Sequence, residues 1–510
     1  MSDSDNLLKD AKHLGIVDDL IGNSNLLTTL EQLSRWGFFV DPVLSAPEPF
    51  PIRSYYRKYL EQGLHPWAIA YFAMVCLKRA NVHRSGELKP DRFIKAINSY
   101  KEVSGPLPDN SEQIRSAFIR LAFQQFPYRR QWWTGMSRTR FMYGRSNSSH
   151  TEFLAELIND LWGVTIDELL TLCLLIYFSL RHKISLQKEC FLTKDEIGTG
   201  FLPWVDKEVL AAVLSSLSQT QDEFKARCAE NEFSDRSLKI FDLNPLLTKP
   251  LIRFGDRYYA PLPMLVPVWA TSGIVYTLLK HTTLNKADGS FGNTLGHAFE
   301  DYIAYLLDSK GIAYIPEIPF KIGRNEVKSA DYIIVEDKAA IIFDCKSRRV
   351  NRDHRGGIIN ETHRDYEEAI IKGIKQSIQT EDWIRCGIEP LCSIPLLSSV
   401  ENYLHAVVTM DDYYLSNSWI QEDVNLDSDK HEPFQVLSVH EFELLLYNLP
   451  KGTIISAIRK KAESPETSSM SYRDYCFYLK DEERVPKVVD PSKDFVLSVL
   501  ADLKSKLQHS

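Results

Sequence analysis

Two aspartates and a lysine lie close together in a stretch of the chain that is otherwise apolar. Residues 329–349, SADYIIVEDKAAIIFDCKSRR, have the pattern of two strands joined by a tight turn. The first strand carries Asp331, the second carries Asp344, and Lys346 follows two residues later. Carboxylate oxygens are ligands that suit Mg²⁺ or Mn²⁺, and a lysine beside them can stabilise negative charge. The alternative is a purely structural, salt-bridged triad at the end of a strand.

The expected register of this hairpin brings the two acids together. With Asp337–Lys338 as the turn, counting outward places Asp331 opposite Asp344. Alternation of side chains then puts Lys346 on the same face as Asp344, whereas a one-residue bulge would move Asp344 to the other face. Two carboxylates in an apolar setting cost free energy unless a cation joins them. Lys346 supplies one positive charge, and a divalent metal supplies two.

These residues resemble the signature of the PD-(D/E)XK nuclease superfamily, which has a restriction-endonuclease-like fold. Ala330–Asp331 matches the first element, with alanine at the proline position, and Asp344–Cys345–Lys346 matches the second. A helix is expected before the strands, at 294–309, and another after them, at 362–380. The resemblance covers residues 286–445. It implies an α/β core in which helices flank a central mixed sheet.

The resemblance also implies a set of site residues. Asp331 and Asp344, with the carbonyl of Cys345, would hold Mg²⁺ or Mn²⁺, while Lys346 would activate the attacking water. Glu300, on the helix before the strands, would complete the metal site through water or a second ion; its alternative is an exposed helix glutamate. The reaction implied is metal-assisted hydrolysis of a phosphodiester bond.

The helix after the strands supplies two further candidates. Gln376 points away from the expected apolar stripe of this helix, so it faces either the substrate or water. Lys372 lies one turn earlier and is a candidate for contact with nucleic acid. Nucleases of this superfamily often carry a glutamine or lysine here.

Two basic stretches are candidates for phosphate contacts. The loop KSRRVNRDHRGG follows the hairpin and contains Arg348, Arg349, Arg352 and Arg355. Arginines in such a loop suit phosphate binding, and the alternative is a solvated basic loop. The second stretch, 129–145, interleaves arginines with Trp132, Trp133, Phe141 and Tyr143, and no acid occurs between Glu112 and Glu152. This pattern suits single-stranded nucleic acid, a protein interface, or a buried aromatic cluster with exposed arginines.

The rest of the chain predicts a multi-domain α/β protein with a mainly helical N-terminal part. Helical periodicity dominates residues 1–195. Residues 196–285 mix helices with a hairpin that turns at Gly255–Asp256. The nuclease-like domain would span 286–445, and a partly helical tail would span 446–510. The boundary near 285 falls in the polar stretch KHTTLNKADGSFGN, which contains two glycines.

Composition excludes several classes of protein. The net charge of −8 argues against a chain coated with basic residues for nucleic acid, so any grip on phosphate must be local. The eight cysteines contain no CxxC pair, which argues against a zinc cluster or a disulfide framework. The N-terminus is acidic and polar, and the longest apolar runs are shorter than the ~20 residues of a membrane span. We therefore expect a cytoplasmic protein without membrane segments.

Taken with the resemblance, these features predict a Mg²⁺-dependent endonuclease. The superfamily favours DNA over RNA as the substrate. A large N-terminal region joined to a nuclease core without a P-loop resembles effectors of bacterial anti-phage defence or restriction systems, which act with partner proteins. The first alternative is an RNA-cleaving toxin with the same site. The second is a nuclease fold kept as a scaffold or binding subunit of a nucleic-acid-processing complex.

Overall fold

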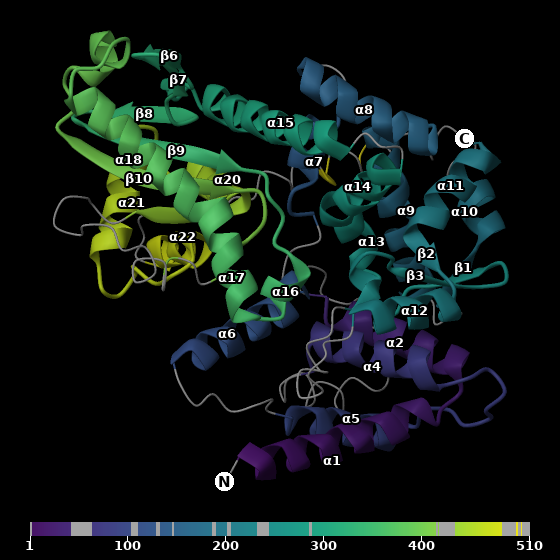
Figure 1. Cartoon of the computed structure of the whole chain (residues 1–510). Coiled ribbons are helices and arrows are strands. Elements are labelled where there is room, and N and C mark those ends of the chain that lie inside the picture. The colour runs from purple at the N-terminus through teal and green to yellow at the C-terminus, as the bar shows by residue number, and fades with distance from the viewer. Residues whose placement is uncertain are drawn as a thin grey trace. The chain divides into compact units, whose positions relative to one another are not determined.

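The computed structural model divides the chain into two compact units, which are described separately. The first contains Met1–Arg140 and Ala155–Lys286, and the second contains Phe141–Leu154 and Ala287–Ser510. The fold is mixed α/β, with helices and sheets in both units (Figure 1). The structure describes residues 3–41, 64–103, 111–128, 133–144, 147–185, 190–200, 206–231, 244–284, 288–414, 417, 434–481, 496–497 and 501.

The first unit is mainly helical and has one small sheet. Its strands have the order β1-β4-β3-β2, and β3 and β4 form the predicted hairpin, in which Gly255 has a φ of 62°. The strands are β1 (Phe191–Thr193), β2 (Ser218–Gln219), β3 (Leu251–Phe254) and β4 (Arg257–Tyr259). The helices are α1 (Asp3–Gly22), α2 (Leu26–Phe39), α4 (Pro66–Arg79), α5 (Pro90–Lys101), α6 (Ser111–Gln125), α9 (Ile166–Ser185), α10 (Lys194–Gly200), α11 (Lys207–Leu217), α12 (Gln221–Asn231), α13 (Leu265–Val268) and α14 (Ile274–Leu284).

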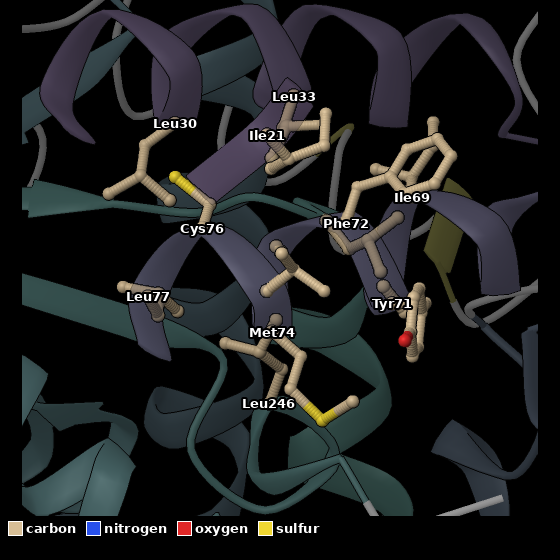
Figure 2. Packing of buried hydrophobic residues seen from close by; sticks show 14 of the residues in the cluster. Ile21, Leu30, Leu33, Ile69, Tyr71, Phe72, Met74, Cys76, Leu77 and Leu246 are labelled. Carbon is tan, nitrogen blue, oxygen red and sulfur yellow. The ribbon is translucent and has the colours of Figure 1, made fainter. Parts of the chain in front are cut away.

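The core of the first unit forms around α4. Every residue of this helix from Pro66 to Leu77 is buried, which is the pattern of a helix that is apolar all round. In Figure 2, Cys76 of α4 lies beside Leu30 of α2, whereas Met74 lies beside Leu246 on the other side of the helix. Because α4 is covered on all sides, the neighbouring helices need only one apolar face each.

The second unit contains a five-stranded mixed sheet with the order β11-β10-β9-β8-β5. β8 pairs with β5 and β9 in antiparallel fashion, whereas β10 is parallel to β9 and β11. A separate antiparallel ribbon, β6–β7, has mostly exposed residues. The strands are β5 (Tyr314–Pro316), β6 (Pro319–Ile322), β7 (Asn325–Lys328), β8 (Tyr332–Glu336), β9 (Ala339–Lys346), β10 (Asn402–Thr409) and β11 (Gln435–Ser438).

Helices cover this sheet from both sides (Figure 1). α18 packs on β9 and β10, and α20 packs on β10 and β11 behind the sheet, together with α15. A turn of π-helix, η5 (Glu367–Ile371), joins α17 to α18. The helices are α15 (Asp288–Ser309), α16 (Arg352–Arg355), α17 (Ile359–Tyr366), α18 (Lys372–Arg385), α20 (Val439–Asn448), α21 (Ile454–Glu463) and α22 (Tyr472–Asp481). Two helices, α7 (Met136–Met142) and α8 (Ser149–Trp162), each cross from one unit to the other along the chain.

The compact units differ from the four predicted domains. Residues 1–195 and 196–285 belong to one unit, apart from Phe141–Leu154, which joins the second. The predicted tail, 446–510, lies in the second unit together with 286–445, because its helices pack on the sheet. The carboxylate of Glu336, at the end of β8, accepts hydrogen bonds from the amides of Ile454 (3.3 Å) and Ile455 (2.8 Å) at the start of α21. The hydroxyl of Tyr472 donates to Gln435 of β11 (2.7 Å).

No single helix among the described residues is long and apolar enough to cross a membrane. The pair Ser149–Trp162 and Ile166–Lys183 reaches the required length and apolarity only when the two helices are taken together, and they are bent by 53°.

Lys461 of α21 predicts a pH dependence of stability. Its side chain is fully buried, donates to the carbonyl of Ser468 (2.9 Å) and lies 4.5 Å from the ring centre of Tyr472. Burial lowers the pKa of Lys461 to about 8. The folded protein then loses this proton before the unfolded chain does, so the free energy of unfolding should rise between pH 8 and about 10.5, by up to roughly 3 kcal/mol. Denaturant unfolding at several pH values measures the rise.

The matched variants for this prediction are Lys461→Met and Lys460→Met. Lys461→Met should abolish the rise, because no buried amine remains to titrate. Lys460, the residue before Lys461 in the same helix, is exposed. Lys460→Met should therefore keep the rise. Parallel pH profiles for Lys461→Met and the wild type would contradict the prediction.

Candidate active site

The β8–β9 hairpin has the register predicted from the sequence. Asp337 adopts a φ of 53° in the turn, and Glu336 pairs with Ala339. The last pair of the ladder is Tyr332 with Phe343, so Asp331 and Asp344 are the next residues outward on the two strands. Asp331 accepts a hydrogen bond on Oδ2 from the amide of Cys345 (2.7 Å), which extends the pairing to the acids. The hairpin therefore holds the two carboxylates on neighbouring strands without a bulge.

Asp344 is a fully buried carboxylate in the middle of the unit. Its residue exposure is 0%, and its Oδ2 forms an ion pair with the ammonium of Lys346. Its Oδ1 makes no hydrogen bond within the part of the chain that the structure describes. A buried anionic oxygen without a donor is costly. The neighbouring carboxyl of Asp331 forms a side-chain hydrogen bond with Asp344 when it is protonated, and a bound cation would offset the same cost in its place.

Burial and the crowding of like charges shift the pKa values of the ionisable groups around Asp344. Burial, followed by the charge of Asp344, raises the pKa of Asp331 to about 8. Burial also raises the pKa of Asp344, and burial with the charge of Asp331 raises the pKa of Glu300. Burial by itself lowers the pKa of Lys346, but the adjacent Asp344 outweighs it, so the net pKa is raised and the amine stays protonated. The three acids therefore resist ionisation together, and a bound divalent cation would favour their ionised forms.

Glu300 lies on α15, as predicted, although the helix starts earlier than residue 294 and spans Asp288–Ser309. The helix ends before Gly311, which has a φ of 61°. The hydroxyl of Tyr332, the first residue of β8, donates to the carbonyl of Glu300 (2.8 Å), which fixes this turn of α15 beside the hairpin. The Glu300 carboxylate accepts from Nδ1 of His297 (3.1 Å) and is about one third exposed.

Gln376 binds the backbone next to the site. Its side-chain amide donates to the carbonyl of Ser329 (3.0 Å), two residues before Asp331. One turn later on α18, the hydroxyl of Thr380 accepts from the amide of Ala330 (2.8 Å). Sequence analysis missed Thr380, although its position four residues after Gln376 places both on one helix face. Together they hold the segment that leads into Asp331.

The close packing of α18 against Asp344 depends on a glycine. A Cβ atom on Gly373 would lie 2.9 Å from Cγ2 of Val407 and 3.1 Å from Oδ2 of Asp344. Both distances are below ordinary van der Waals contact. The glycine therefore lets the helix backbone approach the carboxylate and keep water away from it.

The arginines of the basic loop are paired with acids from distant parts of the unit. Arg348 forms ion pairs with Asp365 (3.3 Å) and Glu368. Asp411, just after β10, pairs with Arg349 and with Arg355 (3.4 Å). Asp365 also accepts from the amide of Asn351 (3.0 Å) and from Nδ1 of buried His354 (3.2 Å). The loop is thus held to the domain, and a role in binding nucleic acid stays a prediction.

Lys372 and Arg352 are the other two residues of this region that were predicted to contact nucleic acid. Lys372 is exposed at the start of α18, as a residue that contacts a large ligand must be. The backbone of Arg352 begins α16, but its side chain lies outside the described residues.

The second basic stretch is described only in part, since Arg129, Arg130, Trp132 and Arg145 lie outside the described residues. Tyr143 is buried, and Trp133 is half-buried. The ring of Phe141 packs on the ring of Tyr305, with 4.6 Å between the two ring centroids. These contacts give the described aromatic side chains a packing role. Stacking on bases is not tested by them.

The donor set at the hairpin limits how a metal could be held. Among the described residues, no three side chains of His, Cys, Asp or Glu are arranged to hold a metal ion. A metal at this position would therefore need main-chain or water ligands besides carboxylates. Buried Asp344 Oδ1 and the raised pKa values of Asp331 and Glu300 nevertheless fit a divalent cation in chemistry and charge.

The first prediction at this site concerns Gly373→Ala. Alanine is the better helix former by about 1 kcal/mol, yet its Cβ would collide with Val407 and press on Asp344. We expect the free energy of unfolding to fall by roughly 1–3 kcal/mol, as measured by denaturant unfolding. Gln379→Ala, at an exposed position of the same helix, is the control and should be neutral or slightly stabilising. A Gly373→Ala protein more stable than the wild type would contradict the steric argument.

The second prediction concerns Asp331→Asn. The folded pKa of about 8 lies above the ordinary value of 3.8. The wild type should therefore lose stability relative to Asp331→Asn as the pH rises from about 4 to 8, by up to roughly 6 kcal/mol at ~1.4 kcal/mol per pKa unit. Asparagine keeps the acceptor for the Cys345 amide. Thermal unfolding without divalent cations tests this, with exposed Asp382→Asn as the control; equal pH profiles for the wild type and Asp331→Asn would show that the carboxylate is not destabilised.

Comparison with known proteins gives no relative for this chain. Neither a protein-family model nor a curated protein nor a solved structure matches it. The nuclease resemblance therefore rests on the residues of the hairpin and its flanking helices.

Proposed function

We propose that this protein is a metal-dependent nuclease that hydrolyses phosphodiester bonds, with a restriction-endonuclease-like core in its second unit. The observation that carries the proposal is the pairing of β8 with β9. It brings Asp331 and Asp344 together with Lys346 at a position where the Asp344 carboxylate is fully buried. A structural role alone would be better served by apolar residues, because a buried ion pair often adds no net stability.

The metal would be Mg²⁺ or Mn²⁺. Asp331, Asp344 and the carbonyl of Cys345 would hold it, and Glu300 would reach it through water, since hard oxygen ligands are the ones these ions prefer. When bound, the ion would supply Lewis-acid polarisation of the phosphoryl group and lower the pKa of water.

The protein's own groups have separate roles in this proposal. Lys346 stays protonated at neutral pH, because Asp344 raises its pKa. Its ammonium can donate a hydrogen bond to the attacking water and stabilise negative charge on the phosphoryl oxygens. Gln376 and Thr380 keep the backbone before Asp331 in place, and Gly373 lets α18 exclude water from Asp344.

DNA is the proposed substrate, by resemblance to the superfamily. Exposed Lys372 and the partly exposed Arg348 are the described basic side chains that this proposal assigns to phosphate contacts. The first unit would then serve recognition or bind a partner protein, as in effectors of anti-phage defence. That assignment rests on the similar arrangement of a large N-terminal region joined to a nuclease core in those effectors.

A second candidate is a nuclease fold retained as a scaffold. The ion pair between Lys346 and Asp344 favours it, because the lysine already neutralises the buried acid. The absence of three grouped ligand side chains among the described residues points the same way. A scaffold should bind Mn²⁺ poorly and cleave nothing.

The test is a cleavage assay on plasmid, linear DNA, single-stranded DNA and RNA with Mg²⁺, Mn²⁺ or EDTA. We expect cleavage that requires the metal and falls at least about 100-fold in Asp344→Ala and Lys346→Ala. Lys338→Ala, an exposed lysine in the turn of the same hairpin, should cleave like the wild type.

The same assay separates the alternatives. Cleavage restricted to RNA would favour the toxin. Equal cleavage by the wild type and both site variants would mean a contaminating activity and reject the site. With no cleavage, Mn²⁺ titration by calorimetry decides: absent binding supports the scaffold.

A further inference from the structure

A segment from elsewhere in the sequence packs on the helix that carries Glu300. Phe141–Leu154 belongs to the second unit, although the residues on both sides of it belong to the first. The ring of Phe141 lies 5.4 Å from that of Tyr302 and 4.6 Å from that of Tyr305, both on α15. These contacts dock the segment on α15.

The turn that starts α8 binds the residue next to Glu300. The hydroxyl of Ser148 donates to Oδ2 of Asp301 (2.6 Å), and Nδ1 of His150 approaches the same oxygen (3.2 Å). The turn is held by reciprocal bonds between Ser148 and Thr151: the Ser148 amide donates to the Thr151 hydroxyl (2.9 Å), and the Thr151 amide donates to the Ser148 hydroxyl (3.2 Å). The turn that these bonds hold therefore binds the carboxylate of Asp301.

His150 also reaches Glu300 through a second histidine. Its ring stacks on His297 with 4.8 Å between centroids and 29° between planes. His297 in turn donates from Nδ1 to Oε2 of Glu300 (3.1 Å). His297, Glu300 and Asp301 lie within two turns of α15, so the turn contacts this patch at Asp301 and at His297.

The chemistry of Glu300 explains why such support matters. The Glu300 side chain is about one third exposed, so it has several accessible rotamers, and fixing one of them costs side-chain entropy. The stacked His150 limits where the His297 ring can lie, and the bond from His297 limits the carboxylate of Glu300. Groups that orient a ligand side chain in this way typically matter 10–100-fold for metal affinity.

We infer that the Ser148–His150 turn is a positioning element for the carboxylate of Glu300, acting through His297 and Asp301. The inference rests on the proposed function, because it assigns Glu300 to that same site. It makes His150 a positioning residue that does not touch the substrate. It also makes the site depend on a segment roughly 150 residues away in the sequence.

The test uses the full-length protein with His150→Ala, and with His150→Phe to restore the stacked ring. Exposed His363→Ala, on α17, is the matched control. The first readout needs no activity: carbodiimide coupling of a small amine to carboxylates, with mass spectrometry to follow the rate at Glu300. Exposed Glu326 serves as the internal reference. The second readout is the Mn²⁺ concentration for half-maximal cleavage, with the melting temperature measured alongside.

We expect His150→Ala to speed labelling of Glu300 relative to Glu326 and to raise the half-maximal Mn²⁺ concentration about tenfold, with the melting temperature nearly unchanged. His150→Phe should recover most of both effects. His150→Ala combined with Glu300→Gln should need no more Mn²⁺ than Glu300→Gln alone, because both changes remove the same interaction.

Unchanged labelling of Glu300 in His150→Ala would overturn the inference, as would additive effects in the double variant. The two failures can be told apart. If the wild type cleaves no substrate but His150→Ala still speeds labelling, the positioning role stands and the nuclease proposal fails. If the wild type cleaves and His150→Ala changes neither readout, the positioning role alone fails.

Discussion

The burial of the Asp344 carboxylate is the constraint on which the second unit depends. A fully buried anion is tolerated only when nearby groups offset its lost hydration. Lys346 offsets part of it from the same strand, and the glycine at 373 lets a helix backbone seal it from water. The neighbouring acid, Asp331, works against this arrangement, as its raised pKa shows. An ordinary core would avoid such a pair, and sites that store unfavourable electrostatics are often functional.

Much of this site could be predicted because its parts are local. The turn at Asp337–Lys338 fixes the register, and strand alternation then fixes which side chains meet. Glu300 could be assigned to its helix for a similar reason, since the apolar stripe of α15 spans many residues. Periodicity also identified β10 and the helix that follows the hairpin, although it did not foresee the turn of π-helix at Glu367–Ile371.

The features that escaped prediction depend on distant residues. The loop after β9 looked strongly basic, yet Asp411 pairs with Arg349 and Arg355 from across the domain. The helices after residue 450 looked like a tail, yet Glu336 binds the start of α21 from the end of β8. The same holds for His150, which meets His297 only after folding. Spacing along a chain cannot reveal a partner that lies 56 or more residues away, because loop lengths do not fix which surfaces meet.

Because Phe141–Leu154 belongs to the second unit, neither unit is a continuous stretch of the sequence. The chain passes from one unit to the other at 140/141, 154/155 and 286/287. A single recombination breakpoint therefore cannot exchange either unit whole. A fragment that begins at Ala287 would lack the aromatic cover of Tyr302 and Tyr305, and it would leave Asp301 without its hydroxyl donor from Ser148.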